Sequence, residues 1–366
     1  MKIYIFLGDL SSKGGIERVS VALANGLAKF YDVTIISLYR ATRNLSFVPD
    51  EKVNVIYLYD EFEKSMYNRN LGAIIGLKFD FLYIIKKLKQ LKRLNLELNK
   101  NDVLISSDIK MSLLLFFYAK KSKIIAIEHF EHDVGNLVLR KIRSALYPKL
   151  SAVVSQTGED QIKYLQWLPR KKHKIIPNII SFEATDIPQN KIEQKNVLAV
   201  GRLTHQKGFD LLLQAWADAN THDWRLKIIG DGEELNHLNS LITELNIFNA
   251  EIIPFQKDIQ RHYSSAGIFV LSSRFEGLGM VLLEALSSGL ACISFDCPAG
   301  PKSIISSDNG VLVPTGDTIK LSQAISFLIN NEEERKRLQN KAAASVEKFK
   351  ESNVIAKWRE LLNEIS

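Results

Sequence analysis

Two glutamates in the segment SSRFEGLGMVLLEALSSG (272–289) have a spacing suited to chemistry on a phosphorylated ligand. Glu276 and Glu284 are eight residues apart, and Gly277 and Gly279 follow the first of them. The apolar run that precedes them predicts a buried strand, and MVLLEALSS predicts the helix that follows. Glu276 would then lie in the loop at the carboxyl edge of a sheet.

The start of that predicted helix is suited to hold a phosphate. The backbone N–H groups of Gly277, Leu278, Gly279 and Met280 would point from it towards a ligand, because unpaired donors and the positive end of the helix dipole lie there. Glu284, one or two turns into the helix, would reach a hydroxyl of the same ligand. The alternative is that Glu276 only caps the helix while Glu284 is solvated.

A second strand, turn and helix, KNVLAVGRLTHQKGFDLLLQAW, carries two cations in its turn. Arg202 and Lys207 are five residues apart, with Gly201 and Gly208 beside them. The planar guanidinium of arginine can pair with two oxygens of an anion at once. Two cations on one loop are otherwise ordinary solvated surface.

A Gly pair, Gly14 and Gly15, lies between the predicted first strand KIYIFLGDL and the helix that follows it. These glycines would let the backbone approach a diphosphate at the start of the helix. The pair alone is a weak signal, because a Gly pair at such a turn usually makes only the turn, and no G-x-G-x-x-G is present.

The composition is that of a soluble globular protein with room for two domains. The chain has 366 residues, of which 46% are hydrophobic and 24% charged, and a single core rarely extends over such a length. Residues 1–180 contain 29 Lys and Arg against 17 Asp and Glu, a net charge of +12, whereas residues 181–366 contain 19 against 24, a net −5. A basic half could meet nucleic acid, an anionic membrane or an anionic substrate, and composition does not choose among them.

The first half alternates strands and helices as a doubly wound parallel α/β sheet does. Pro169 and Pro177 interrupt regular structure after it. We therefore expect an N-terminal domain over 1–176, a C-terminal domain over 177–350 and a last helix over 351–366. The buried face of that helix should be Trp358, Leu361 and Leu362.

The pattern S-x-x-E-G-x-G-x-x-x-L-E-A, which contains E-x7-E, resembles the retaining glycosyltransferases of family 4, which have the GT-B architecture. The resemblance implies two Rossmann-like doubly wound domains that face a central cleft, with a C-terminal helix that crosses back to the first domain. In that family the Arg and Lys of G-R-L-x-x-x-K-G-x-D hold the donor diphosphate, which implies this role for Arg202 and Lys207. A Gly pair at the position of Gly14 and Gly15 faces the donor.

The resemblance also indicates the nucleotide and sugar sides of the site. It implies that Gly230, Pro254 and Phe255 lie near the ribose and base together with Glu284, and that Gly300 faces the transferred sugar. Family members commonly have G-G-x-x-E at this last place. This chain has Ala-Gly-Pro-Lys-Ser over 299–303, so the acidic residue is missing. The family pattern at this loop therefore does not predict which sugar is transferred.

The segment SKIIAIEHFEHD gathers Glu128, His129, Glu131, His132 and Asp133 just after a predicted strand. Such a cluster could suggest a metal site, but its spacing matches none of the standard zinc patterns. The resemblance favours another interpretation, in which a histidine at a strand end of the first domain lines the cleft near the sugar. His129 is the candidate.

These motifs together predict a retaining glycosyltransferase that moves a hexose or N-acetylhexosamine from a nucleotide diphosphate sugar to a bacterial surface glycan or lipid-linked glycan, with alpha linkage. Glu276 and His129 are the expected catalytic residues. The chain contains no D-x-D, so no catalytic metal is expected. The alternatives are a GT-B nucleotide-sugar epimerase, whose motifs differ, and a non-catalytic nucleotide- or glycan-binding protein of the same fold.

An apolar stripe with basic neighbours over 81–93 could lie on an anionic membrane. The alternative is a packed surface helix with solvated lysines. The stripe is formed by Phe81, Ile84, Ile85, Leu88 and Leu91, with Lys86, Lys87, Lys89, Lys92 and Arg93 around it. No apolar run approaches the length of a membrane span, and the first strand meets Asp9 too early for a secretory signal. We therefore expect a cytoplasmic protein with no nucleic-acid partner. If the apolar stripe binds a membrane, the protein is peripheral on its inner face.

Overall fold

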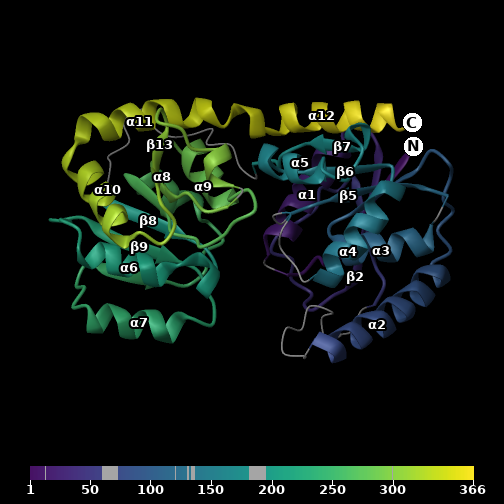
Figure 1. Cartoon of the computed structure of the whole chain (residues 1–366), viewed down its shortest axis with the longest axis horizontal. Coiled ribbons are helices and arrows are strands. Elements are labelled where there is room, and N and C mark those ends of the chain that lie inside the picture. The colour runs from purple at the N-terminus through teal and green to yellow at the C-terminus, as the bar shows by residue number, and fades with distance from the viewer. Residues whose placement is uncertain are drawn as a thin grey trace. The chain divides into compact units, whose positions relative to one another are not determined.

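The computed structural model describes residues 1–12, 14–59, 73–119, 121–129, 132, 137–180, 195–298 and 300–366, with side chains from residue 81 onward in the third of these ranges. It divides into two compact units. Unit 1 consists of Met1–Ile179 and Glu351–Ser366, and unit 2 consists of Ile180–Lys350. Each unit contains one parallel sheet with helices on both of its faces (Figure 1).

Seven parallel strands form the sheet of unit 1, in the order β3-β2-β1-β4-β5-β6-β7. They are β1 Lys2–Asp9, β2 Asp32–Tyr39, β3 Val53–Tyr57, β4 Val103–Ser106, β5 Lys123–Ile127, β6 Ala152–Ser155 and β7 His173–Ile175. The order reverses between β1 and β4. Ligands of doubly wound sheets bind at the carboxyl ends of the strands beside such a point.

Alternate side chains of β1 belong to two hydrophobic layers, as expected for a strand that is buried on both faces. Ile3, Ile5 and Leu7 pack with helices α1 and α12, while Tyr4 and Phe6 pack in the layer of α2 to α5. The helices are α1 Gly15–Leu27, α2 Ala73–Arg93, α3 Ile109–Tyr118, α4 Leu137–Leu146, α5 Gly158–Tyr164 and α12 Glu351–Glu364.

The C-terminal helix α12 belongs to unit 1, which confirms the expectation from the resemblance. Trp358, Leu361 and Leu362 are buried in the same core as β1, as predicted. A Cβ added to Gly26 of α1 would lie 2.5 Å from the side chain of Ile355, so the two helices touch at close range there.

Helix α2 divides the predicted apolar stripe between the core and the surface. Ile84, Leu88 and Leu91 pack into unit 1, whereas Phe81 and Ile85 are exposed, as is Leu82. The prediction that Lys87 is a surface cation was wrong: its side chain is fully buried, and its Nζ donates a hydrogen bond to the carbonyl of Leu38 at 3.1 Å. Within the described part of the chain, the helices all fall short of the length and hydropathy needed to cross a bilayer.

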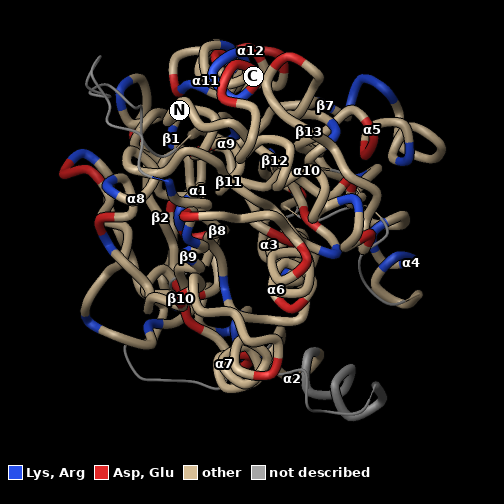
Figure 2. The backbone as a smooth tube through the Cα atoms, turned by 90° about the vertical axis from the view of Figure 1, so that its left-hand side faces the viewer, with Lys and Arg blue, Asp and Glu red and all other residues tan. Residues whose placement is uncertain are grey.

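Six parallel strands form the sheet of unit 2, in the order β10-β9-β8-β11-β12-β13. They are β8 Asn196–Val200, β9 Arg225–Ile229, β10 Ala250–Ile253, β11 Ile268–Leu271, β12 Ala291–Phe295 and β13 Gly310–Val313. The order reverses between β8 and β11. The neighbouring strands β11 and β12 carry no charged residue, as expected for strands at the centre of a covered sheet (Figure 2).

Helices cover both faces of this second sheet. α6, α7 and α10 pack in one hydrophobic layer and α8 and α9 in the other, while α11 contributes Leu338 to the first and Ala342 to the second. They are α6 Phe209–Ala217, α7 Leu235–Glu244, α8 Gln260–Ser265, α9 Met280–Ser287, α10 Thr318–Asn330 and α11 Glu332–Ser345. Both sheets are thus of the Rossmann-like kind that the resemblance implies.

Candidate active site

The candidate residues of unit 2 gather at the carboxyl edge of its sheet. Parallel strands end at a common edge, so the loops after β8, β9, β10, β11 and β12 lie beside one another. Glu284 lies one turn further along, inside α9. The residues in these loops are Arg202, Lys207, Gly230, Pro254, Phe255, Glu276, Gly277, Leu278, Gly279 and Gly300.

An ion pair between Lys207 and Glu276 lies at the centre of this edge. Lys207 ends the short helix His205–Lys207 after β8, and Glu276 follows the neighbouring strand β11. The Nζ of Lys207 donates to Oε1 of Glu276 at 2.5 Å, and the hydroxyl of Ser273 donates to the same oxygen at 2.6 Å. The two side chains are only 14% and 8% exposed. A cation that is largely shielded from water is thereby held where a diphosphate could replace or share its carboxylate partner.

The thiol of Cys297 lies close to this pair and does not supply a nucleophile. Burial raises the pKa of Cys297 to about 12, and the charge of Glu276 adds to this effect while that of Lys207 opposes it. The thiol therefore stays protonated at neutral pH, whereas the thiolate is the reactive form. Cys292 is also a buried free thiol.

The start of α9 is formed by glycine backbone. Gly279 is the N-cap residue and has φ = 77°, in the left-handed region that favours glycine. Gly300 lies against this turn, because a Cβ added to it would be 2.3 Å from the carbonyl oxygen of Gly277. The loops after β11 and β12 therefore meet at the point where the sequence predicted phosphate and sugar contacts.

Glu284 is almost completely buried within α9. Its Oε2 accepts a hydrogen bond from the hydroxyl of Tyr263, in α8, at 3.0 Å. The solvated alternative for Glu284 is thus wrong, because the side chain is 1% exposed. Its contact with a ribose hydroxyl stays a prediction.

Hydrogen bonds join the loops on the predicted nucleotide side. A Cβ added to Gly230 would lie 1.8 Å from the carbonyl oxygen of Gly201, so the ends of β8 and β9 approach as closely as only glycine allows. The carboxylate of Asp231 accepts the backbone N–H of Phe255 at 3.1 Å, which ties the turn after β9 to the end of β10. Phe255 is 36% exposed. Arg202 is exposed in the loop beside Gly201.

The candidate residues of unit 1 follow β1 and β5. Gly14 is the N-cap residue of α1 and Gly15 its first residue. His129 lies just beyond β5 and lines a small cavity together with Ser20 of α1, Gln156 and Trp358. Burial lowers the pKa of His129 to about 4, so its imidazole is neutral at physiological pH. Both ring nitrogens are buried and have no hydrogen-bond partner among the described residues.

The neighbours of His129 form a structural cluster. The Glu128 carboxylate accepts a hydrogen bond from the Tyr147 hydroxyl and lies 3.9 Å from Nη1 of Arg143. Burial raises the pKa of Glu128 to about 7, although Arg143 opposes the shift. His132 accepts a hydrogen bond from the indole of Trp167 at 3.3 Å. Glu131 and Asp133 lie outside the described residues, and within the described ones no three potential metal ligands come together.

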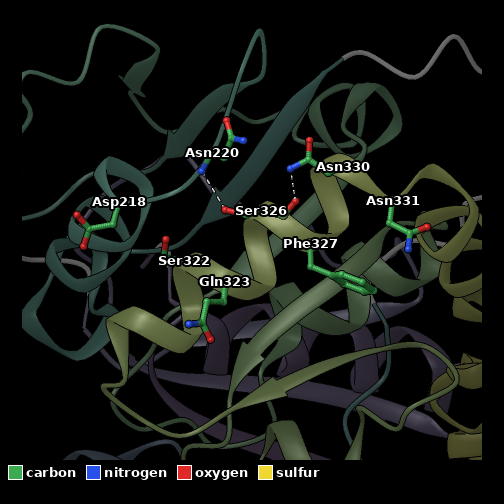
Figure 3. Close-up of a pocket in the computed structure, with 8 residues that line it drawn as sticks. All are labelled: Asp218, Asn220, Ser322, Gln323, Ser326, Phe327, Asn330 and Asn331. Carbon is green, nitrogen blue, oxygen red and sulfur yellow. Dashed lines mark hydrogen bonds between the residues drawn. The ribbon is translucent and has the colours of Figure 1, made fainter.

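A separate hollow of about 600 Å³ lies on unit 2 between the end of α6 and α10 (Figure 3). Its lining consists mainly of polar side chains around Phe327, and the hydroxyl of Ser326 accepts the backbone N–H of Asn220 at 2.9 Å. The lining residues are Asp218, Asn220, Ser322, Gln323, Ser326, Phe327, Asn330 and Asn331. They include no candidate site residue.

Two charged residues near the Lys207–Glu276 pair have no role predicted from the sequence. Arg274 lies two residues before Glu276, Asp210 lies three after Lys207, and their side chains form a double hydrogen bond. The sequence signal for this contact is that a cation lies beside the Glu276 motif and an anion beside the Lys207 motif. They are 64 residues apart, however, and nothing local indicates that they meet.

The chain is similar in sequence to known glycosyltransferases. The family model of group 1 glycosyl transferases matches residues 182–345. An uncharacterized glycosyltransferase of Haemophilus influenzae is 32% identical, and the amylovoran biosynthesis glycosyltransferase of Erwinia amylovora is 30% identical, each with 99% of both chains covered. An alpha-1,4-N-acetyl-D-galactosaminyltransferase of Campylobacter jejuni, named for an undecaprenol-linked glycan, is 28% identical, with 100% of this chain and 99% of the relative covered.

Solved structures share the fold at low sequence identity. Sucrose-phosphate synthase from Thermosynechococcus elongatus aligns with a TM-score of 0.80 at 16% identity, over 100% of this chain and 98% of the other. A lipopolysaccharide outer core galactosyltransferase aligns with a TM-score of 0.73 at 20% identity, over 100% and 99%. With relatives at 30% identity or more along nearly their full length, the chain belongs to the group 1 family of glycosyltransferases and has the GT-B architecture.

Proposed function

We propose that this glycosyltransferase moves a hexose or N-acetylhexosamine from a UDP-sugar to a bacterial surface glycan, with retention at the anomeric carbon and an alpha linkage. The observation that carries the proposal is the shielded Lys207–Glu276 pair at the carboxyl edge of unit 2. The acceptor would be lipopolysaccharide, capsule or an undecaprenyl-linked oligosaccharide. Two relatives support this class, since one is named for amylovoran biosynthesis and another for an undecaprenol-linked acceptor and an alpha-1,4 linkage.

The chemical problem for such an enzyme is the leaving group. When the bond between the anomeric carbon and the diphosphate oxygen breaks, its electron pair and the negative charge move to the diphosphate. Lys207 and Arg202, with the backbone N–H groups at the start of α9, would stabilise that charge. Removal of one such donor typically lowers turnover by about 10²–10³ fold.

The sugar side of the reaction would involve Glu276 and His129. Because burial keeps His129 neutral, its imidazole would border the sugar without adding a positive charge beside the forming oxocarbenium ion. The acceptor hydroxyl would attack from the face that the diphosphate leaves. Its oxygen would bond to the anomeric carbon, and its proton would pass to the departing phosphate oxygen.

We propose that the two cations do the work that a metal ion does in other transferases. The support is in the sequence, which contains no D-x-D to hold a metal on the diphosphate. Lys207 and Arg202 would supply the compensating charge directly.

The same proposal places the enzyme at the inner face of a bacterial membrane as a peripheral protein. Phe81, Leu82 and Ile85 form an exposed apolar face on α2, and Lys86, Lys89 and Lys92 are exposed around it. Each basic side chain near an anionic bilayer contributes about 1 kcal/mol, and the attraction falls off within a Debye length. Lys87 takes no part because it is buried.

A hydrolysis screen tests the proposed function. The protein is incubated with UDP-, GDP- and ADP-sugars without acceptor, and the released nucleoside diphosphate and free sugar are measured. Slow release from one nucleotide class, abolished in Lys207→Met, is the expected result. Recovery of an epimerised nucleotide sugar, or binding without any turnover, would contradict it.

A further inference from the structure

Two loops of unit 2 carry the Lys207–Glu276 pair, and several hydrogen bonds join them. The Lys207 loop is residues 204–208 and the Glu276 loop is residues 272–276. The backbone N–H of Arg274 donates to the carbonyl of Gln206 at 2.8 Å, and Gln206 Nε2 donates to the carbonyl of Phe275 at 3.0 Å. The hydroxyl of Ser272 donates to the carbonyl of Lys207 at 3.0 Å. The two loops therefore pack against each other as one body, although they follow different strands, β8 and β11.

The Arg274 side chain adds the strongest of these connections. Its Nη1 and Nη2 donate to the two carboxylate oxygens of Asp210 at 2.8 and 2.7 Å, and Nη1 also donates to the carbonyl of His205 at 2.8 Å. Asp210 lies in the first turn of α6. One guanidinium thus joins the Glu276 loop both to the Lys207 loop and to the helix that follows it.

Both partners of this contact are charged at neutral pH. Burial alone would raise the pKa of Asp210, but the hydrogen bonds and charge of Arg274 lower it below its usual value. The same contact raises the pKa of Arg274. The side chains are 24% and 21% exposed, so water screens this pair less than it screens an open surface pair.

The two loops also meet backbone to backbone at Gly208. Gly208, which separates Lys207 from α6, has φ = 62°, and a Cβ added to it would lie 2.1 Å from the carbonyl oxygen of Ser272. Because backbone meets backbone here, a shift of the Glu276 loop must move Gly208 and its neighbour Lys207. The positions of the Lys207 ammonium group and the Glu276 carboxylate consequently depend on the same backbone contact.

We propose that Arg274 and Asp210 are positioning residues, whose bidentate ion pair fixes Lys207 against the donor diphosphate by locking the Lys207 loop to the Glu276 loop. The inference rests on the proposed function of Lys207 and deepens it. Lysine has a flexible four-carbon stem and a point charge, so its placement depends on the backbone that carries it. A misplacement of about 1 Å in such a group costs about 10²-fold in rate.

The test compares Arg274→Lys, Asp210→Asn and the double variant in the hydrolysis assay, with the nucleotide sugar that the wild type turns over fastest. Arg337→Lys is the matched control, because Arg337 makes a similar double hydrogen bond to Glu334 at 2.7 and 2.8 Å on the exposed surface of α11. We expect kcat to fall at least about 30-fold in each single variant while KM changes less than about threefold. The double variant should be no slower than the slower single one, since both changes break one contact.

Three results would overturn the inference. Wild-type kcat in both single variants would show that the contact does not position Lys207, and losses that multiply in the double variant would show two independent roles. Normal kcat in Asp210→Asn with a loss in Arg274→Lys would mean that Arg274 touches the donor itself. If Asp210→Asn does not fold, Asp210→Glu replaces it, and thermal unfolding of every variant is compared with Arg337→Lys. An active Lys207→Met would instead refute the proposed function.

Discussion

Replacement of Lys207 by methionine should separate the stability role of the ion pair from its catalytic role. The change keeps the length of the side chain. It leaves the Glu276 carboxylate, which is 8% exposed, with the hydroxyl of Ser273 as its side-chain hydrogen-bond donor among the described residues. A buried acceptor that loses a hydrogen-bond partner lowers the free energy of unfolding by about 1–3 kcal/mol. In a domain of this size each kcal/mol lowers the thermal midpoint by about 2–4 °C, so we expect a fall of roughly 4–8 °C for 2 kcal/mol.

A second change in the same chain should restore stability without restoring turnover. Adding Glu276→Gln removes the stranded charge while keeping the shape, so the double variant should unfold near the wild-type temperature. Hydrolysis should stay about 10²–10³ times slower in both Lys207→Met and the double variant, because the diphosphate has lost its cation. Arg202→Met is the comparison, since Arg202 is exposed and its loss should lower turnover with little change in midpoint.

Differential scanning calorimetry and nucleoside diphosphate release measure the two effects on the same preparations. Near wild-type turnover in Lys207→Met would refute the assignment of Lys207 to the diphosphate. An unchanged midpoint in Lys207→Met, or no recovery when Glu276→Gln is added, would refute the argument that the pair is a shielded charge contact.

Three further predictions concern metal, pH and membrane. Turnover should be unchanged in EDTA, whereas a strict requirement for Mn²⁺ would contradict the proposed role of Arg202 and Lys207. Burial lowers the pKa of both His129 and His173 from 6.5 to about 4. Between these pH values the unfolded chain binds protons that the folded chain does not. The free energy of unfolding should therefore fall as the pH falls from 6.5 to 4. Urea titrations should show a smaller fall in His173→Gln, and equal slopes in both proteins would refute the assignment. The wild type should sediment with anionic liposomes at low salt and be released at high salt. A variant with Gln at Lys86, Lys89 and Lys92 should bind less than a control variant with Gln at Lys320, Lys336 and Lys341. Equal recovery of the two variants would leave no role for α2 in membrane binding.

The local parts of the site were predictable because each depends on one turn of the chain. The position of Glu276 before a glycine-rich helix start, and the spacing of Arg202 and Lys207, follow from a strand that ends and a helix that begins. The burial of Lys87 was not predictable in this way. Its place in the sequence between Lys86 and Leu88 is that of an ordinary surface lysine, and the hydrogen bond from its ammonium group to the carbonyl of Leu38 on β2 joins residues that are 49 positions apart.

The sequence by itself determined the two α/β units, because continuous apolar runs that alternate with amphipathic helices can be buried only as covered parallel strands. It also determined which residues reach the carboxyl edge of the second sheet. Only the tertiary structure decided which of them meet: Lys207 and Glu276 are 69 residues apart, and Asp210 and Arg274 are 64 apart. The physical reason is that β8 and β11 are neighbours in the sheet although β9 and β10 lie between them in the chain. That order results from long-range packing, which no local spacing encodes.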